Sequence, residues 1–136
     1  MEYVMRIRKV LVGCTIILVA LIAASKVLPL VIDAAYPRMR ASTRAFQVGS
    51  VRDGTYEGKA FLLPVSVRVR ASVSGGRLQS IDILKHFNGQ GKPAEAIVPR
   101  VIEAQSLGVD IISGATHSSL TILKAIENAL EKGSTP

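Results

Sequence analysis

The order of apolar and polar positions divides the chain into an apolar N-terminal segment and a mixed C-terminal segment. Residues 10–32 are almost entirely apolar, and this run is long enough to cross a bilayer as a helix. The alternative is a cleaved signal peptide, with residues 10–24 as its apolar core and Ala23-Ala24-Ser25 as a cleavage site. We favour an uncleaved anchor, because the apolar run continues through residues 27–32.

Strict alternation indicates the clearest strand of the C-terminal segment. From Val65 to Val73 every second residue is apolar, as expected for a strand with one buried face. Ser74-Gly75-Gly76-Arg77 predicts a hairpin turn in which glycine supplies a positive φ, and residues 78–85 return as a further strand. Residues 55–60 predict a strand before this hairpin, and Asp53-Gly54 forms the turn that leads into it.

Helical periodicity follows the hairpin. It predicts a helix from Gly114 to Lys132, with Ser113 as its N-cap and Gly133 as its stop. We expect a shorter helix to begin at Pro99, because proline fits the first turn of a helix and not its interior. A hairpin with one apolar face needs a helical cover. The expected fold class is therefore α+β: a small antiparallel sheet covered by helices, preceded by one N-terminal transmembrane helix.

These patterns give four segments. Residues 1–9 form a basic N-terminal tail, 10–32 the transmembrane anchor, 33–51 a linker along the membrane surface, and 52–136 the folded domain. Within the linker we expect a partial helix around residues 38–46. Residues 107–112 of the domain are expected to run extended into its last helix.

Positive charge is concentrated outside the expected domain. Eight of the 17 Lys and Arg residues lie in the first 52 residues, whereas the remaining chain has nine basic and eight acidic residues. A nucleic-acid-binding domain needs a basic face of its own, so we expect no nucleic acid partner. Basic residues around the apolar run instead suit the anionic headgroups of a lipid bilayer.

A compact turn, Asp110-Ile111-Ile112-Ser113-Gly114-Ala115-Thr116, precedes the long predicted helix. Thr116 lies in its first turn, where unpaired N–H groups and the helix dipole favour an anion such as phosphate. An ordinary capped helix start has the same local residues and needs no ligand. The surrounding sequence decides between these two interpretations.

The turn resembles the covalent flavinylation signature of the FMN-binding domain family, Asp-x-x-Ser/Thr-Gly-Ala-Thr/Ser. The resemblance extends to Asp53–Gly58, Pro93–Ile97 and Ala104–Ser106, and it covers the chain from Arg52 to the C-terminus. It implies that Thr116 carries covalent FMN through a phosphoester. It also implies a separate flavin transferase that uses FAD as donor. The recognition turn would then comprise four further residues: Asp110, Ser113, Gly114 and Ala115.

The same resemblance implies a function. Such domains occur in the C and G subunits of sodium-pumping and Rnf-type respiratory complexes and in small membrane-anchored flavoproteins. We therefore expect a flavoprotein electron carrier, rather than a stand-alone enzyme, that works with membrane redox proteins or a quinone-linked dehydrogenase. The domain is expected on the periplasmic or extracellular side of the cell membrane. Arg6, Arg8 and Lys9 next to the apolar run agree with this orientation, although Arg38, Arg40 and Arg44 flank its other side.

The chain has two histidines, His86 and His117. In the family, the loop His86–Lys92 lies near the flavin, so His86 is a candidate flavin contact; the alternative is a polar residue at a strand end. His117 follows Thr116 but points about 100° away on the helix, and we expect it to matter little for attachment. No metal site is expected, because no cysteine or carboxylate cluster is spaced to complete one.

Two other functions remain open. A tethered sensor or assembly module could keep this fold without flavin. A flavin reductase acting on a soluble acceptor is less consistent with the sequence, which has no glycine-rich dinucleotide-binding βαβ unit.

Overall fold

The computed structural model describes residues 1–87 and 92–134. The chain forms two compact units, Met1–Ala35 and Tyr36–Pro136. One helix, α1 (Glu2–Ala45), begins in the first unit and ends in the second. In the described part of the chain, α1 is the one helix long and apolar enough to cross a membrane. That criterion uses length and composition, which a signal sequence also satisfies.

Residues 33–51, predicted as a linker with a partial helix, are mostly helical in the structure. Most of residues 33–51 continue α1 as far as Ala45, and a short 3-10 helix, η1 (Val48–Ser50), follows. These last turns of α1 belong to the C-terminal unit, where Thr43 is buried and Ser42 hydrogen-bonds to Glu127. Tertiary packing therefore extends the helix beyond the partial one expected from the sequence.

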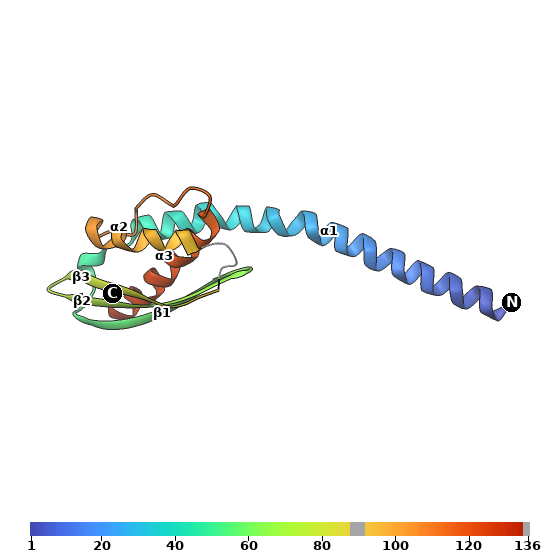
Figure 1. Ribbon diagram of the computed structural model, residues 1–136, viewed down its shortest axis with the longest axis horizontal. Coiled ribbons are helices and arrows are strands. Elements are labelled where there is room, and N and C mark those ends of the chain that lie inside the picture. The colour runs from blue at the N-terminus through green and yellow to red at the C-terminus, as the bar shows by residue number, and fades with distance from the viewer. Residues whose placement is uncertain (88–91, 135–136) are drawn as a thin grey trace. The chain divides into compact units, whose positions relative to one another are not determined.

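The C-terminal unit contains a three-stranded antiparallel sheet in the order β1-β2-β3 (Figure 1). Its strands are β1 (Gly54–Leu62), β2 (Val65–Ser74) and β3 (Arg77–Phe87). The predicted alternation of β2 is confirmed, because the five apolar residues at odd positions from 65 to 73 are all buried. The hairpin turn is also confirmed, with Gly75 and Gly76 at φ values of 61° and 66°.

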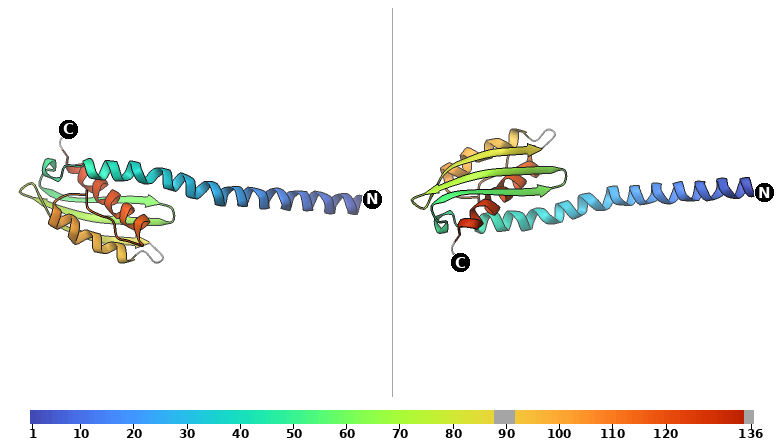
Figure 2. Two further views of the ribbon diagram at one scale, coloured as in Figure 1. Left: turned by 90° about the horizontal axis from the view of Figure 1, so that it is seen from above. Right: turned by 90° about the horizontal axis from the view of Figure 1, so that it is seen from below.

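Helices cover one face of this sheet (Figure 2). After β3 come the 3-10 helix η2 (Lys92–Ala96), α2 (Ile97–Ala104), α3 (Thr116–Leu130) and the final 3-10 turn η3 (Glu131–Gly133). The core lies between α3 and the apolar face of β2, and α3 also packs closely on β1. The expected α+β fold, an antiparallel sheet covered by helices, is confirmed.

Two helix boundaries were predicted wrongly. α2 begins at Ile97, before Pro99, which is tolerated because it still lies in the first turn, where N–H groups have no intrahelical partner. α3 spans Thr116–Leu130 instead of Gly114–Lys132, and its N-cap position is Ala115. Ser113 cannot be the N-cap, because Gly114 after it has φ 76°, outside the helical region.

Candidate functional site

The turn before α3 is fixed by hydrogen bonds at both ends. The backbone N–H of Ala115 donates to the carbonyl of Ile112 at 3.0 Å, which closes a turn with Gly114 at its third position. The positive φ of Gly114 is the geometry that a type II turn requires there. The buried hydroxyl of Ser119, one turn into α3, accepts a hydrogen bond from the N–H of Ile112 at 3.2 Å. The helix thus holds the turn that precedes it.

Thr116 is the first residue of α3 and is half-buried. Ala115 beside it is 9% exposed, whereas Ser113 and Gly114 are exposed. The N–H groups of residues 116–118 have no carbonyl four residues back within the helix. Together with the positive end of the helix dipole, they favour a negatively charged group at this position.

His117 joins this helix start to two other elements. Its Nε2 lies 2.8 Å from the carbonyl oxygen of Leu62 at the end of β1. A carbonyl can only accept, so Nε2 carries the proton, and Nδ1 lies 2.5 Å from the Tyr36 hydroxyl on α1. Sequence reasoning assigned His117 no role. The contact to Tyr36 spans 81 residues and leaves no local signal in the sequence.

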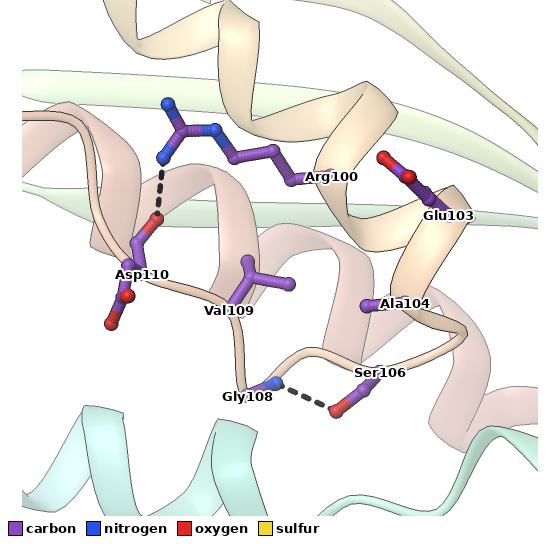
Figure 3. A pocket seen from close by; sticks show the side chains of 7 residues that line it. All are labelled: Arg100, Glu103, Ala104, Ser106, Gly108, Val109 and Asp110. Carbon is purple, nitrogen blue, oxygen red and sulfur yellow. Dashed lines mark hydrogen bonds between the residues drawn. The ribbon is translucent and has the colours of Figure 1, made fainter.

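The described contacts of Asp110 are to Arg40 and Arg100. The side chain of Asp110 is 90% exposed, and its nearest ionic partner is Arg40 of α1, with 3.6 Å between Oδ1 and Nη2. Figure 3 shows its carboxylate turned away from Arg100, whose guanidinium contacts the Asp110 carbonyl at 3.5 Å. Among the described contacts, none joins the Asp110 carboxylate to Thr116.

The hollow in Figure 3 has a volume of about 540 Å³ between α2 and the loop that leads to the turn. Arg100, Glu103 and Asp110 supply its charged lining, and Thr116 is not part of it. This cavity therefore does not by itself identify where a group on Thr116 would lie.

His86 lies at the end of β3, where it pairs with Val67. Its ring is buried, with a side chain only 3% exposed, and its Nδ1 lies 2.9 Å from Glu95 Oε1 of η2. Strand register places His86 at the same end of the sheet as Leu62, and hence as the start of α3 (Figure 2). The two positions share this end without a described contact between them. The remainder of the predicted loop, residues 88–91, lies outside the described residues.

Two buried side-chain nitrogens have no hydrogen-bond partner among the described residues: Arg40 Nη1 and His86 Nε2. Buried polar atoms in folded proteins are normally paired, so both atoms are candidates for contact with a bound group. The unpaired N–H groups at the start of α3 add further donors. Arg40 Nη1 and these N–H groups are donors that suit a phosphate, whereas Nε2 of the neutral His86 ring accepts, because Nδ1 carries the proton that faces the Glu95 carboxylate.

Comparison with known proteins agrees with this chemistry. The family model of the FMN-binding domain matches residues 63–131, just over half of the chain. The chain belongs to the FMN-binding domain family. The resemblance recognised in the sequence is thus confirmed, and FMN is the cofactor that this membership supports.

Two curated relatives match over parts of their length. An uncharacterized protein of Treponema pallidum (strain Nichols) is 28% identical over 96 residues, which are 68% of this chain and 27% of that protein. The NADH:acrylate oxidoreductase of Vibrio harveyi is 38% identical over 52 residues, or 38% of this chain and 5% of the enzyme. The chain therefore spans only a small part of either relative.

Proposed function

We propose that the protein is a membrane-anchored electron carrier whose FMN is attached to Thr116 through a phosphoester. The observation that carries this proposal is the position of Thr116. In a chain of the FMN-binding domain family, a half-buried threonine opens a 15-residue helix at its anion-favouring end. Similarity to a segment of an NADH:acrylate oxidoreductase supports a role in electron transfer.

Attachment needs help from outside the chain. A threonine hydroxyl is a poor nucleophile without a neighbouring base, and both ring nitrogens of His117 are engaged by Tyr36 and Leu62. We therefore assign the base to a flavin transferase with FAD as donor. The Oγ–P bond to Thr116 forms, the bond between the two phosphates of FAD breaks, AMP leaves, and the hydroxyl proton passes to the transferase.

The turn itself is the surface that the transferase would recognise. Ser113 and Gly114 are exposed, and Gly114 has no side chain to obstruct an approaching protein. Asp110 has an exposed carboxylate that makes no described contact with the acceptor hydroxyl. Its proposed role is therefore contact with the transferase, and unchanged flavinylation in Asp110→Ala would remove that role.

His86 is proposed as a contact to the flavin ring. Its Nδ1 is engaged by Glu95, which leaves Nε2 as the atom available to a ligand. In the neutral ring this Nε2 accepts, so it suits an N–H group of the flavin. Arg40 Nη1 is an available donor and suits an anionic oxygen. When bound, FMN supplies the ability to take up electrons singly or in pairs, while the protein supplies attachment and orientation.

The anchor gives the carrier its location. We propose that α1 crosses the cell membrane once and that the C-terminal unit lies on the periplasmic or extracellular side, where covalent attachment prevents loss of FMN by diffusion. Tethering raises the effective concentration of the carrier near membrane redox proteins or a quinone-linked dehydrogenase.

In-gel flavin fluorescence tests the attachment. The full chain is co-expressed with a flavin transferase, denatured and run beside Thr116→Ala, Thr116→Ser and Thr55→Ala. We expect a fluorescent band in the wild type, in Thr116→Ser and in the Thr55→Ala control, whose exposed threonine lies on β1. The band should be absent from Thr116→Ala. A dark wild-type band from well-expressed protein would favour a tethered module of the same fold without flavin.

A further inference from the structure

The face of the sheet that the helices leave open carries a row of three cations. Lys59 on β1 pairs with Arg68 on β2, and Arg68 pairs with Lys85 on β3, so their side chains share one face. All three residues are exposed, and none has an ion pair among the described residues. Like charges directly opposite each other on neighbouring strands repel. This row therefore favours an anionic partner.

The neighbouring row, which is closer to the β2–β3 hairpin turn, differs from the cationic row in its charges. Toward the turn, Arg70 lies between Glu57 and Asp82, and its guanidinium contacts the Glu57 carboxylate at 2.7 Å. That row thus has two carboxylates and one guanidinium. The cationic row has no carboxylate, so the positive charge is a property of one end of the sheet rather than of the whole face.

Beyond the cations lies an apolar row at the tip of the sheet. Phe61 and Phe87 both pair with Ser66, so the two rings lie on the same open face. They are 67% and 64% exposed, and Leu63 in the β1–β2 turn is 46% exposed. Successive rows on one face are about 7 Å apart. The order of these rows, aromatic rings at the tip and cations in the next row, matches a bilayer interface, in which the apolar hydrocarbon is followed by anionic headgroups.

Chain connectivity limits the distance between this tip and the anchor. One imidazole, His117, joins Leu62 beside the tip to Tyr36, the first residue of the C-terminal unit. By chain length alone, the four residues from position 32 to position 36 span at most about 14 Å. If the apolar run of α1 is in the membrane, this short connection keeps the tip of the sheet within reach of the headgroups.

We propose that this tip docks on the surface of a bilayer rich in anionic lipid, with Phe61, Leu63 and Phe87 in the interface and the three cations at the phosphates. The proposal rests on the proposed membrane anchoring. Docking would hold the start of α3, and with it Thr116, beside the membrane. A group on Thr116 would then lie within reach of redox partners in the lipid phase.

Site-specific fluorescence in lipid nanodiscs tests the docking. The full chain carries Cys14→Ser, so that one introduced cysteine takes an environment-sensitive nitrobenzoxadiazole label at Phe61→Cys, Phe87→Cys or Thr55→Cys. Thr55 lies on the same face of the same strand as Phe61, at the far end. In discs of phosphatidylcholine and phosphatidylglycerol we expect blue-shifted emission and several-fold stronger quenching by doxyl lipids at positions 61 and 87 than at 55.

Lipid charge supplies the second comparison. Quenching at position 61 should fall toward that at position 55 in discs of phosphatidylcholine alone. It should fall in the same way in anionic discs when the three cations are replaced together, by Lys59→Gln, Arg68→Gln and Lys85→Gln. Equal quenching at positions 55 and 61 in anionic discs would overturn the docking while leaving the anchor intact. A blue shift without doxyl quenching would indicate a protein on this face and also overturn it. Failure of the chain to co-purify with the discs would refute the anchoring itself. Flavin attachment is scored separately by the in-gel assay.

Discussion

At the scale of single residues, His117 fixes the position of the proposed attachment turn. His117 follows Thr116 directly in the sequence. Its ring accepts a hydrogen bond from the Tyr36 hydroxyl on α1 and donates one to the carbonyl of Leu62 on β1. Both bonds are partly buried, so each group that His117 engages would lose a partner if the ring were removed.

We predict that His117→Ala lowers the free energy of unfolding of the C-terminal unit by about 1–3 kcal/mol, the cost of leaving partly buried polar groups unpaired. Urea unfolding of the detergent-solubilised full chain, followed by circular dichroism, measures this difference. Tyr36→Phe removes only the hydroxyl end of the bridge and should cost less. Wild-type stability in His117→Ala would contradict the assigned role.

Asp53 shows how one carboxylate supports a turn. Its two oxygens accept hydrogen bonds from the N–H groups of Gly75 and Gly76, at 2.9 and 3.2 Å. These bonds to Gly75 and Gly76 hold the pKa of Asp53 below its ordinary value of 3.8. A pKa that is lowered in the folded state stabilises the protein at pH values above the ordinary pKa. This stabilisation is lost as the pH falls through the lowered pKa.

We therefore predict that Asp53→Asn weakens the dependence of stability on acid. The wild type should lose more stability than Asp53→Asn between pH 6 and pH 3, measured as the shift of the urea midpoint. The pKa of Glu57 is also lowered, chiefly by the hydrogen bond from Arg70. Because both proteins keep Glu57, its contribution to the loss of stability in acid is the same in each. Parallel pH profiles would show that Asp53 does not contribute.

At the scale of elements, α3 and β1 pack so closely that only glycine fits between them. A Cβ on Gly58 would lie 2.1 Å from the carbonyl oxygen of Ala125 and 2.4 Å from the backbone nitrogen of Ala129. Both neighbours are helix backbone and cannot move aside alone. Side chains of α3 also cover the free edge of β1, since Asn128 donates to the carbonyl of Lys59 at 2.8 Å.

Gly58→Ala should separate α3 from β1 and destabilise the C-terminal unit by about 1–3 kcal/mol or more, the usual cost of overpacking. Thermal unfolding monitored by circular dichroism measures the loss. Gly49→Ala is the matched control, because a Cβ at Gly49 meets nothing within 4 Å. A similar unfolding temperature for both variants would mean that the close approach is not required.

Sequence patterns predicted the elements whose signal is local. The alternation from Val65 to Val73 requires only that one face of a strand be buried, and the two glycines of the hairpin supply their own geometry. Boundaries were predicted less well where competing geometry decides. Ser113 has the chemistry of an N-cap, but the positive φ of Gly114 moves the helix start to Thr116.

The site divides in the same way. The turn from Asp110 to Thr116 is contiguous, so its residues could be found from their order alone. The groups that contact it or the residue after it come from a distant segment, α1: Arg40 contacts Asp110, and Tyr36 contacts His117. Their contacts depend on how α1, α3 and the sheet pack, and no sequence period specifies that packing.

At the scale of the whole molecule, the distribution of charge agrees with a protein that works at a membrane. Basic residues flank the apolar run of α1, whereas residues 53–136 have nine basic and eight acidic residues, with the cationic row on the open sheet face. The same end of that unit holds the start of α3 and His86. The docking face and the proposed flavin position would thus belong to one end of the unit.

Mass spectrometry of the full chain, purified after co-expression with a flavin transferase, tests the covalent attachment of FMN to Thr116. We expect an intact mass raised by one FMN less one water, with fragmentation placing the addition on Thr116. The Thr116→Ala protein should have its unmodified mass. An unmodified Thr116, in cells where the same transferase flavinylates another acceptor domain, would contradict covalent attachment of FMN at this residue.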